Sequence, residues 1–105
     1  MIIDSHQHFW NYHPIKDKWI VSSMKILKRD YLPKDLKPNL DENGIDGCIA
    51  VQADQSENEN EFLLNLAEKN SFIKGVVGWI DLTDENIEQK LAYYKTKSLF
   101  KGIRN

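Results

Sequence analysis

Short apolar segments alternate with longer amphipathic segments along this chain. Segment 47–53 is nearly continuous in apolar residues, as expected of a parallel strand that is buried on both faces. The pattern predicts four strands, at about 1–5, 47–53, 73–80 and 100–104. Cys48, Gly75 and Lys101 lie at matching places in the last three strands, and their spacings of 27 and 26 residues make the repeat regular.

Three helices are predicted between these strands from their start and stop residues. Pro33 suits the first position of a helix, and Gly44 can adopt the left-handed conformation that ends it. Ser56 and Glu59 have the spacing of a capping box for the second helix, and Thr83 can cap the third. The expected inner faces comprise Leu36 and Leu40, then Phe62, Leu63, Leu66 and Ala67, then Ile87 and Leu91.

Alternating strands and helices indicate parallel βαβ units, which form either a closed (β/α)8 barrel or an open doubly wound sheet. The glycine-rich sequences of dinucleotide-binding folds and P-loop nucleotide hydrolases are both absent. Two histidines, His6 and His8, follow the first strand and favour the barrel, because barrel sites are built at the carboxyl ends of the strands. We therefore predict one partial barrel domain over 1–105.

Residues 10–32 interrupt this regular pattern. They mix aromatic and basic side chains with a proline, without a clear period. A loop of this length is usually functional or disordered, and its bulky residues argue against disorder. We interpret it as an insertion over the mouth of the site, with a loop that simply covers the sheet as the alternative.

Composition limits the classes of function. The 105 residues are 41% hydrophobic and 29% charged, with a formal charge of −2, so nothing in them attracts nucleic acid or an anionic membrane. No apolar run approaches the roughly 20 residues of a membrane span, and the start lacks the pattern of a secretory signal. A single cysteine, Cys48, cannot form an internal disulfide. We expect a cytoplasmic protein.

His6 and His8 are the candidate metal ligands. Side chains two apart in a strand point to the same face, so both imidazoles can reach one divalent ion such as zinc. Such an ion polarises a carbonyl and makes water acidic enough to supply hydroxide near neutral pH. The alternative is that the two histidines are surface residues without a function, and that their spacing is a coincidence.

The segment Ile3-Asp4-Ser5-His6-Gln7-His8-Phe9-Trp10 resembles the opening of amidohydrolase-related proteins. Within them it is most similar to the branch with sugar-lactone hydrolases, such as L-fuconolactonase-like and L-rhamnonolactonase-like enzymes. The resemblance continues through Arg29-Asp30-Tyr31-Leu32-Pro33, Asn43-Gly44-Ile45-Asp46-Gly47, Val51-Gln52-Ala53, Gly75-Val76-Val77-Gly78-Trp79-Ile80-Asp81-Leu82 and Lys101-Gly102-Ile103-Arg104. Each motif is weak alone, but their common order is fairly specific.

This resemblance implies the amino-terminal half of a (β/α)8 barrel of well over twice this length. It implies addition of water to a small cyclic ester, a sugar lactone, either assisted by a divalent metal ion or without a metal. Further ligands and the general acid and base are then expected on later strands, so the catalytic residues are unknown here and the 105 residues alone are expected to be inactive. A decarboxylase or another hydrolase of a small carboxylate is one alternative, and a non-catalytic small α/β binding module is another.

Three further residues are candidates for binding a small-molecule substrate. Gln52 ends the second strand and can donate to a substrate oxygen, although it could equally cap the strand end. Arg104 ends the fourth strand, where its planar guanidinium suits a carboxylate or a polarised carbonyl, with a surface ion pair as the alternative. Arg29 precedes the first helix and could reach the same mouth or stay in solvent. The oligomeric state is not predicted.

Overall fold

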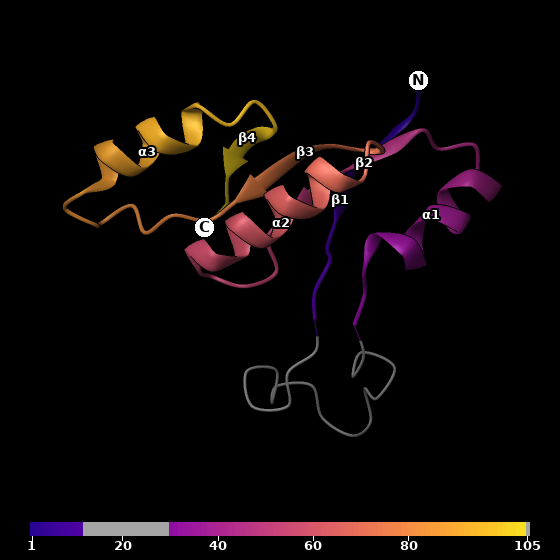
Figure 1. Ribbon diagram of the computed structural model, residues 1–105, viewed down its shortest axis with the longest axis horizontal. Helices are drawn as coiled ribbons and strands as arrows, with labels where there is room; N and C mark the ends of the chain where they lie inside the picture. The colour runs from indigo at the N-terminus through magenta and orange to yellow at the C-terminus, as the bar shows by residue number, and fades with distance from the viewer. Residues whose placement is uncertain (12–29, 105) are drawn as a thin grey trace.

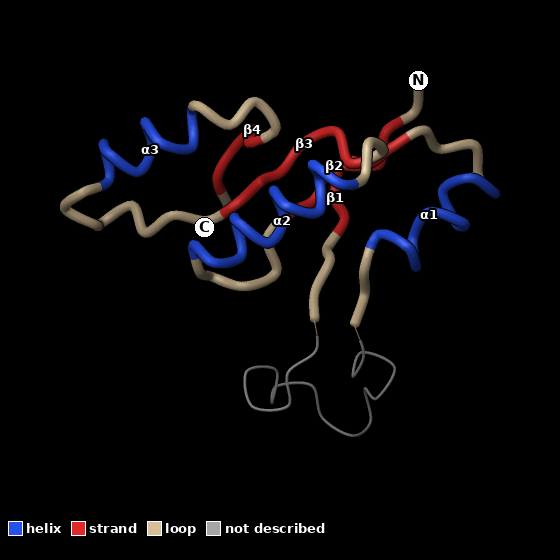
Figure 2. The backbone as a smooth tube through the Cα atoms, in the orientation of Figure 1, coloured by secondary structure: helices blue, strands red, loops and turns tan. Residues whose placement is uncertain are grey.

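The fold consists of four strands and three helices in the predicted chain order. The computed structural model describes residues 1–11 and 30–104. Its elements are β1 (Ile3–Gln7), α1 (Pro33–Glu42), β2 (Gly47–Val51), α2 (Glu57–Lys69), β3 (Ile73–Gly78), α3 (Ile87–Lys95) and β4 (Phe100–Ile103), as Figure 2 shows. None of the described helices is long and apolar enough to cross a membrane.

The four strands form one parallel sheet in the order β1-β2-β3-β4. Parallel neighbours are joined by right-handed crossovers, so three successive crossovers in one direction place all three helices on the same face. Figure 1 shows them following one another, with α1 and α3 at opposite ends and α2 between them. A doubly wound sheet reverses its strand order and carries helices on both faces. The observed order is that of a barrel segment.

The hydrophobic core lies between the sheet and the helices. Cys48 and Val76 of neighbouring strands are fully buried, as is Leu63 of α2. Leu36 and Leu40 of α1 face inward as predicted, Leu40 fully and Leu36 in part. This face of the sheet is apolar because the helices cover it.

The first strand lies two residues later than the apolar pattern predicted. Met1 and Ile2 are 93% and 60% exposed, and β1 instead runs from Ile3 through polar residues to Gln7. Pairing with β2 sets this range, because Ile3 lies opposite Gly47 and Gln7 opposite Ala50. The strand therefore brings His6 inside its range and His8 directly after it.

The predicted start and inner face of the third helix were wrong in part. Asn86, and not Thr83, precedes α3, because the amide and hydroxyl of Thr83 both donate to Asp81 Oδ1 at 2.9 and 2.6 Å and form a turn. Leu91 is 42% exposed, whereas Tyr94 is buried and stacks on Phe100 at 4.7 Å. Ile87 packs against the core as predicted, and Tyr94, one turn after Leu91 on the helix, takes the buried place that was expected for Leu91.

Most of the predicted insertion lies outside the described residues, together with Arg29. At its base Trp10 and Tyr31 pair as a short antiparallel bridge, with backbone hydrogen bonds of 2.9 and 2.8 Å. Their rings also touch, with centroids 4.6 Å apart. The two ends of the predicted insertion are thus joined directly beyond β1.

Cys48 is expected to resist alkylation in the native protein. Burial raises the pKa of its thiol to about 11, and the nearby Asp4 carboxylate acts in the same direction. Only the thiolate attacks an alkylating reagent, so the thiol form that persists at pH 8 is unreactive as well as inaccessible. Mass spectrometry after iodoacetamide treatment should find Cys48 modified only when denaturant is present, and rapid native modification would contradict its placement.

Candidate functional site

The polar side chains that the sequence singled out meet at the carboxyl ends of the strands. His6 lies in β1, His8 follows it, Gln52 follows β2 and Arg104 follows β4. Carboxyl ends of parallel strands share one edge of the sheet, which is where barrel enzymes build their sites. The structure thus brings four of the five predicted site residues together, and the fifth, Arg29, lies outside the described residues.

His6 and His8 face each other on one side of the strand. Their Nε2 atoms are 3.1 Å apart, and their rings meet edge to face with centroids separated by 4.8 Å. His6 is exposed and His8 is half-buried. The period of two therefore predicted the convergence of the two rings, while their role as ligands stays a prediction.

His8 is held by a backbone carbonyl. Its Nδ1 lies 3.0 Å from the carbonyl oxygen of Val51, the last residue of β2. A carbonyl only accepts, so Nδ1 carries the hydrogen and Nε2 keeps a free lone pair. Burial lowers the pKa of His8, the Val51 carbonyl opposes this, and the His6 and Arg104 charges add to the lowering. The lowered pKa favours the neutral form of His8, which is the form that can bind a metal ion.

Arg104 approaches the same pair from β4. Its Nη1 lies 3.2 Å from His6 Nε2, and its backbone amide donates to the carbonyl of Gly78 at 2.8 Å. A guanidinium can only donate, so the Nε2 of His6 acts as the acceptor in this contact. The lone pairs of both histidine Nε2 atoms therefore point into the same space.

This donor set fits a divalent transition-metal ion. Two nitrogens bound at about 2.05 Å to one tetrahedral ion lie roughly 3.3 Å apart, close to the observed 3.1 Å. The Val51 carbonyl behind His8 is the kind of outer partner that orients metal-binding histidines. Among the residues that the structure describes, no cluster of three or more His, Cys, Asp or Glu forms. The role of His6 and His8 as metal ligands stays a prediction.

Gln52 is placed as its alternative role at the end of the strand predicts. Its side chain is 5% exposed, and Nε2 lies 3.5 Å from the carbonyl oxygen of Arg104, at the outer limit of a hydrogen bond. The amide therefore links the ends of β2 and β4, and this placement favours support of the Arg104 backbone. Direct contact of Gln52 with a substrate stays a prediction.

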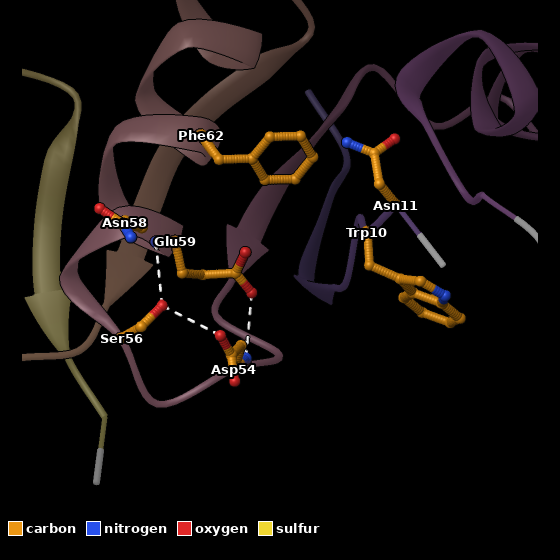
Figure 3. A pocket seen from close by; sticks show the side chains of 7 residues that line it. All are labelled: Trp10, Asn11, Asp54, Ser56, Asn58, Glu59 and Phe62. Carbon is orange, nitrogen blue, oxygen red and sulfur yellow. Dashed lines mark hydrogen bonds between the residues drawn. The ribbon is translucent and has the colours of Figure 1, made fainter. Parts of the chain in front are cut away.

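The loop after β2 is braced by the start of α2. The Glu59 carboxylate accepts from the amides of Ala53 and Asp54 at 2.8 and 3.0 Å, while Ser56 Oγ accepts from the Glu59 amide at 3.3 Å. Only the serine half of the predicted capping box forms, because the carboxylate turns to the loop instead. Figure 3 shows these groups along one side of a cavity of about 170 Å³. The cavity is lined by Trp10, Asn11, Asp54, Ser56, Asn58, Glu59 and Phe62.

Asn60 is a residue that sequence reasoning missed. It is fully buried on α2, where Oδ1 accepts from the Trp79 amide at 2.8 Å and Nδ2 donates to the Trp79 carbonyl at 2.7 Å. A Cβ on Gly78 would overlap this side chain, so the fit depends on glycine there. The available signal was an asparagine three residues before Leu63 on the apolar stripe of α2. Asn60 thereby fixes the carboxyl end of β3, which in turn holds Arg104.

These features place a cluster of polar side chains at the strand ends of a parallel βα scaffold, and comparisons with known proteins show what the chain resembles. No family model matches the chain. Two curated relatives, both named L-fucono-1,5-lactonase, are 41% identical over 103 residues in Burkholderia multivorans and 33% identical over 102 residues in Burkholderia ambifaria. The resemblance to amidohydrolase-related lactonases is confirmed.

Solved structures give the same result. Two crystal structures of an amidohydrolase from Burkholderia multivorans, one with bound zinc and one with bound HEPES, match with a TM-score of 0.92 at 39% identity. They match 100% of this chain but 37% and 36% of their own chains, and the alignments with the curated relatives span 34% and 35% of those. The chain thus spans about a third of the length of the proteins it matches, and the predicted partial barrel is confirmed.

Proposed function

We propose that the protein carrying this chain hydrolyses a small sugar lactone, with L-fucono-1,5-lactone or a close aldonolactone as substrate. The observation that carries the proposal is the convergence of the His6 and His8 Nε2 atoms, 3.1 Å apart, at the strand ends of a chain similar throughout to two lactonases of that name. In the reaction, water oxygen adds to the lactone carbonyl carbon. The ring carbon–oxygen bond then breaks and the free aldonic acid results.

The residues of this chain would bind and orient the reactants. His6 and His8 would hold a divalent ion, for which zinc is the natural candidate because a matching amidohydrolase structure contains it. When bound, zinc polarises a carbonyl and lowers the pKa of water. Arg104 would direct its guanidinium to the carbonyl or carboxylate oxygen of the ligand, since it lies beside His6 and donates in a planar fork. The general acid and base would come from other strands.

The setting we propose is a cytoplasmic enzyme with a small-molecule substrate and no nucleic-acid partner. A formal charge of −2 gives no attraction to phosphate backbones. The buried thiol of Cys48 is free, as in proteins of reducing compartments.

A substrate comparison tests the proposal. The full natural chain should open L-fucono-1,5-lactone with a kcat/KM at least about 100-fold above that for an unsubstituted six-membered lactone, because a site built to bind hydroxyls rejects an analogue that lacks them. Acid release can be followed with a pH indicator, with and without a chelator. Equal rates for both lactones, or carbon dioxide release from a sugar acid without lactone hydrolysis, would favour the alternatives.

A further inference from the structure

The Nε2 atom of His6 has two neighbours within hydrogen-bonding distance. His8 Nε2 lies at 3.1 Å and Arg104 Nη1 at 3.2 Å. A neutral imidazole nitrogen offers one lone pair, and the guanidinium uses it as an acceptor. A metal ion bound by both histidines would need the same lone pair. His6 can therefore serve Arg104 or a metal ion, but not both at once.

We propose that Arg104 competes with a divalent metal ion for His6, so that metal loading transfers the guanidinium from His6 to the substrate. The competition for His6 concerns only metal binding, while the transfer of the guanidinium to the substrate rests on the proposed function. His8 differs from His6 in this respect. Its Nδ1 hydrogen is fixed on the Val51 carbonyl, which leaves Nε2 directed at the shared space. A metal ion thus meets one ready ligand and one that must first release the arginine.

The attachment of Arg104 allows this transfer. Its backbone is fixed on both sides, because the amide donates to the Gly78 carbonyl at 2.8 Å and the carbonyl lies 3.5 Å from Gln52 Nε2. The residue itself is exposed, so the guanidinium can swing while the strand end stays in place. A positive charge beside a divalent cation is also repelled, which directs the released group toward an anionic or polarised oxygen.

Removal of the guanidinium should then have opposite effects on two measurable quantities. Zinc should bind the Arg104→Met variant more tightly, by about tenfold, since no charge-assisted hydrogen bond has to be broken and no like charge remains. The KM for lactone should rise, because the substrate loses its donor. A purely structural role of Arg104 would weaken both zinc binding and substrate binding.

Calorimetric titration of the metal-stripped full natural chain with zinc tests the proposal. Wild type, Arg104→Met and Lys101→Met should be compared at one pH and ionic strength. Lys101 is exposed on β4, three residues before the arginine, and carries the same charge, so its loss controls for general electrostatics. We expect tighter zinc binding for Arg104→Met alone, with less than about a twofold change for Lys101→Met.

Equal or weaker zinc binding by Arg104→Met overturns the proposal, as does an equal gain in both variants or an absence of binding in all three proteins. Lactone hydrolysis is measured separately on the same samples. A tenfold gain in zinc affinity without any lactonase activity in wild type would refute the proposed function and leave the competition intact. Lactonase activity in wild type, together with a zinc affinity that is unchanged in Arg104→Met, would refute the competition and leave the proposed function intact.

Discussion

Replacement of His8 by alanine should weaken zinc binding by about 100-fold or more and reduce lactone hydrolysis to background. The loss of an outer partner of a metal ligand typically costs 10-fold to 100-fold, and the loss of the ligand itself costs more. His8 is the better fixed member of the pair, because the Val51 carbonyl orients its ring and partial burial keeps it neutral. Zinc affinity by calorimetry and kcat/KM for L-fucono-1,5-lactone are the two measurements.

His13→Ala is the matched control, since it removes the remaining histidine of the chain and leaves His6 and His8 unchanged in the sequence. It should leave both quantities within about twofold of wild type. His6→Ala should lower both zinc affinity and lactone hydrolysis, as His8→Ala does. Retention of zinc affinity by His8→Ala would refute the role of the pair as ligands. If hydrolysis survives complete removal of metal but is lost in His8→Ala, the histidines act as hydrogen-bond partners of the substrate instead.

Replacement of Asn60 by alanine should lower the melting temperature of the full natural chain by about 5 °C. The change removes both hydrogen bonds to Trp79 and leaves a buried amide and carbonyl unpaired, a loss of about 3 kcal/mol. One kcal/mol corresponds to roughly 1.6 °C for a domain of roughly 300 residues, because the entropy of unfolding is about 2.1 cal/mol/K per residue. The Tyr94 hydroxyl, which lies against the Asn60 side chain, also loses its partner.

Asn58→Ala controls for helix propensity and for the loss of an amide, because Asn58 lies in the same helix but is exposed. It should change stability by no more than about 0.5 kcal/mol. Differential scanning fluorimetry gives the melting temperatures, and hydrogen exchange at the Trp79 amide gives the local effect. Equal melting temperatures for the two variants would show that the Asn60 contacts contribute little.

The order of the elements was accessible from the sequence because each depends on local signals. Pro33 begins α1 as predicted, and the run of apolar residues after Gly47 forms β2. The start of α3 was not accessible, since Asp81 competes successfully for the donors of Thr83 and forms a turn. The exposure of Leu91 and burial of Tyr94 were not accessible either, because Tyr94 is selected by its stacking on Phe100, which lies in the next strand.

For the candidate site, the sequence determined that His6 and His8 share a face, because alternation along a strand is a local property. Only the tertiary structure decided their partners. The Val51 carbonyl reaches His8 because β2 pairs with β1. The Arg104 guanidinium reaches His6 across 98 positions of sequence because the parallel sheet brings the carboxyl ends of β1 and β4 to the same edge. Such contacts depend on strand order, on register and on the two hydrogen bonds between the Asn60 side chain and the Trp79 backbone. No local pattern of residue types encodes these long-range features.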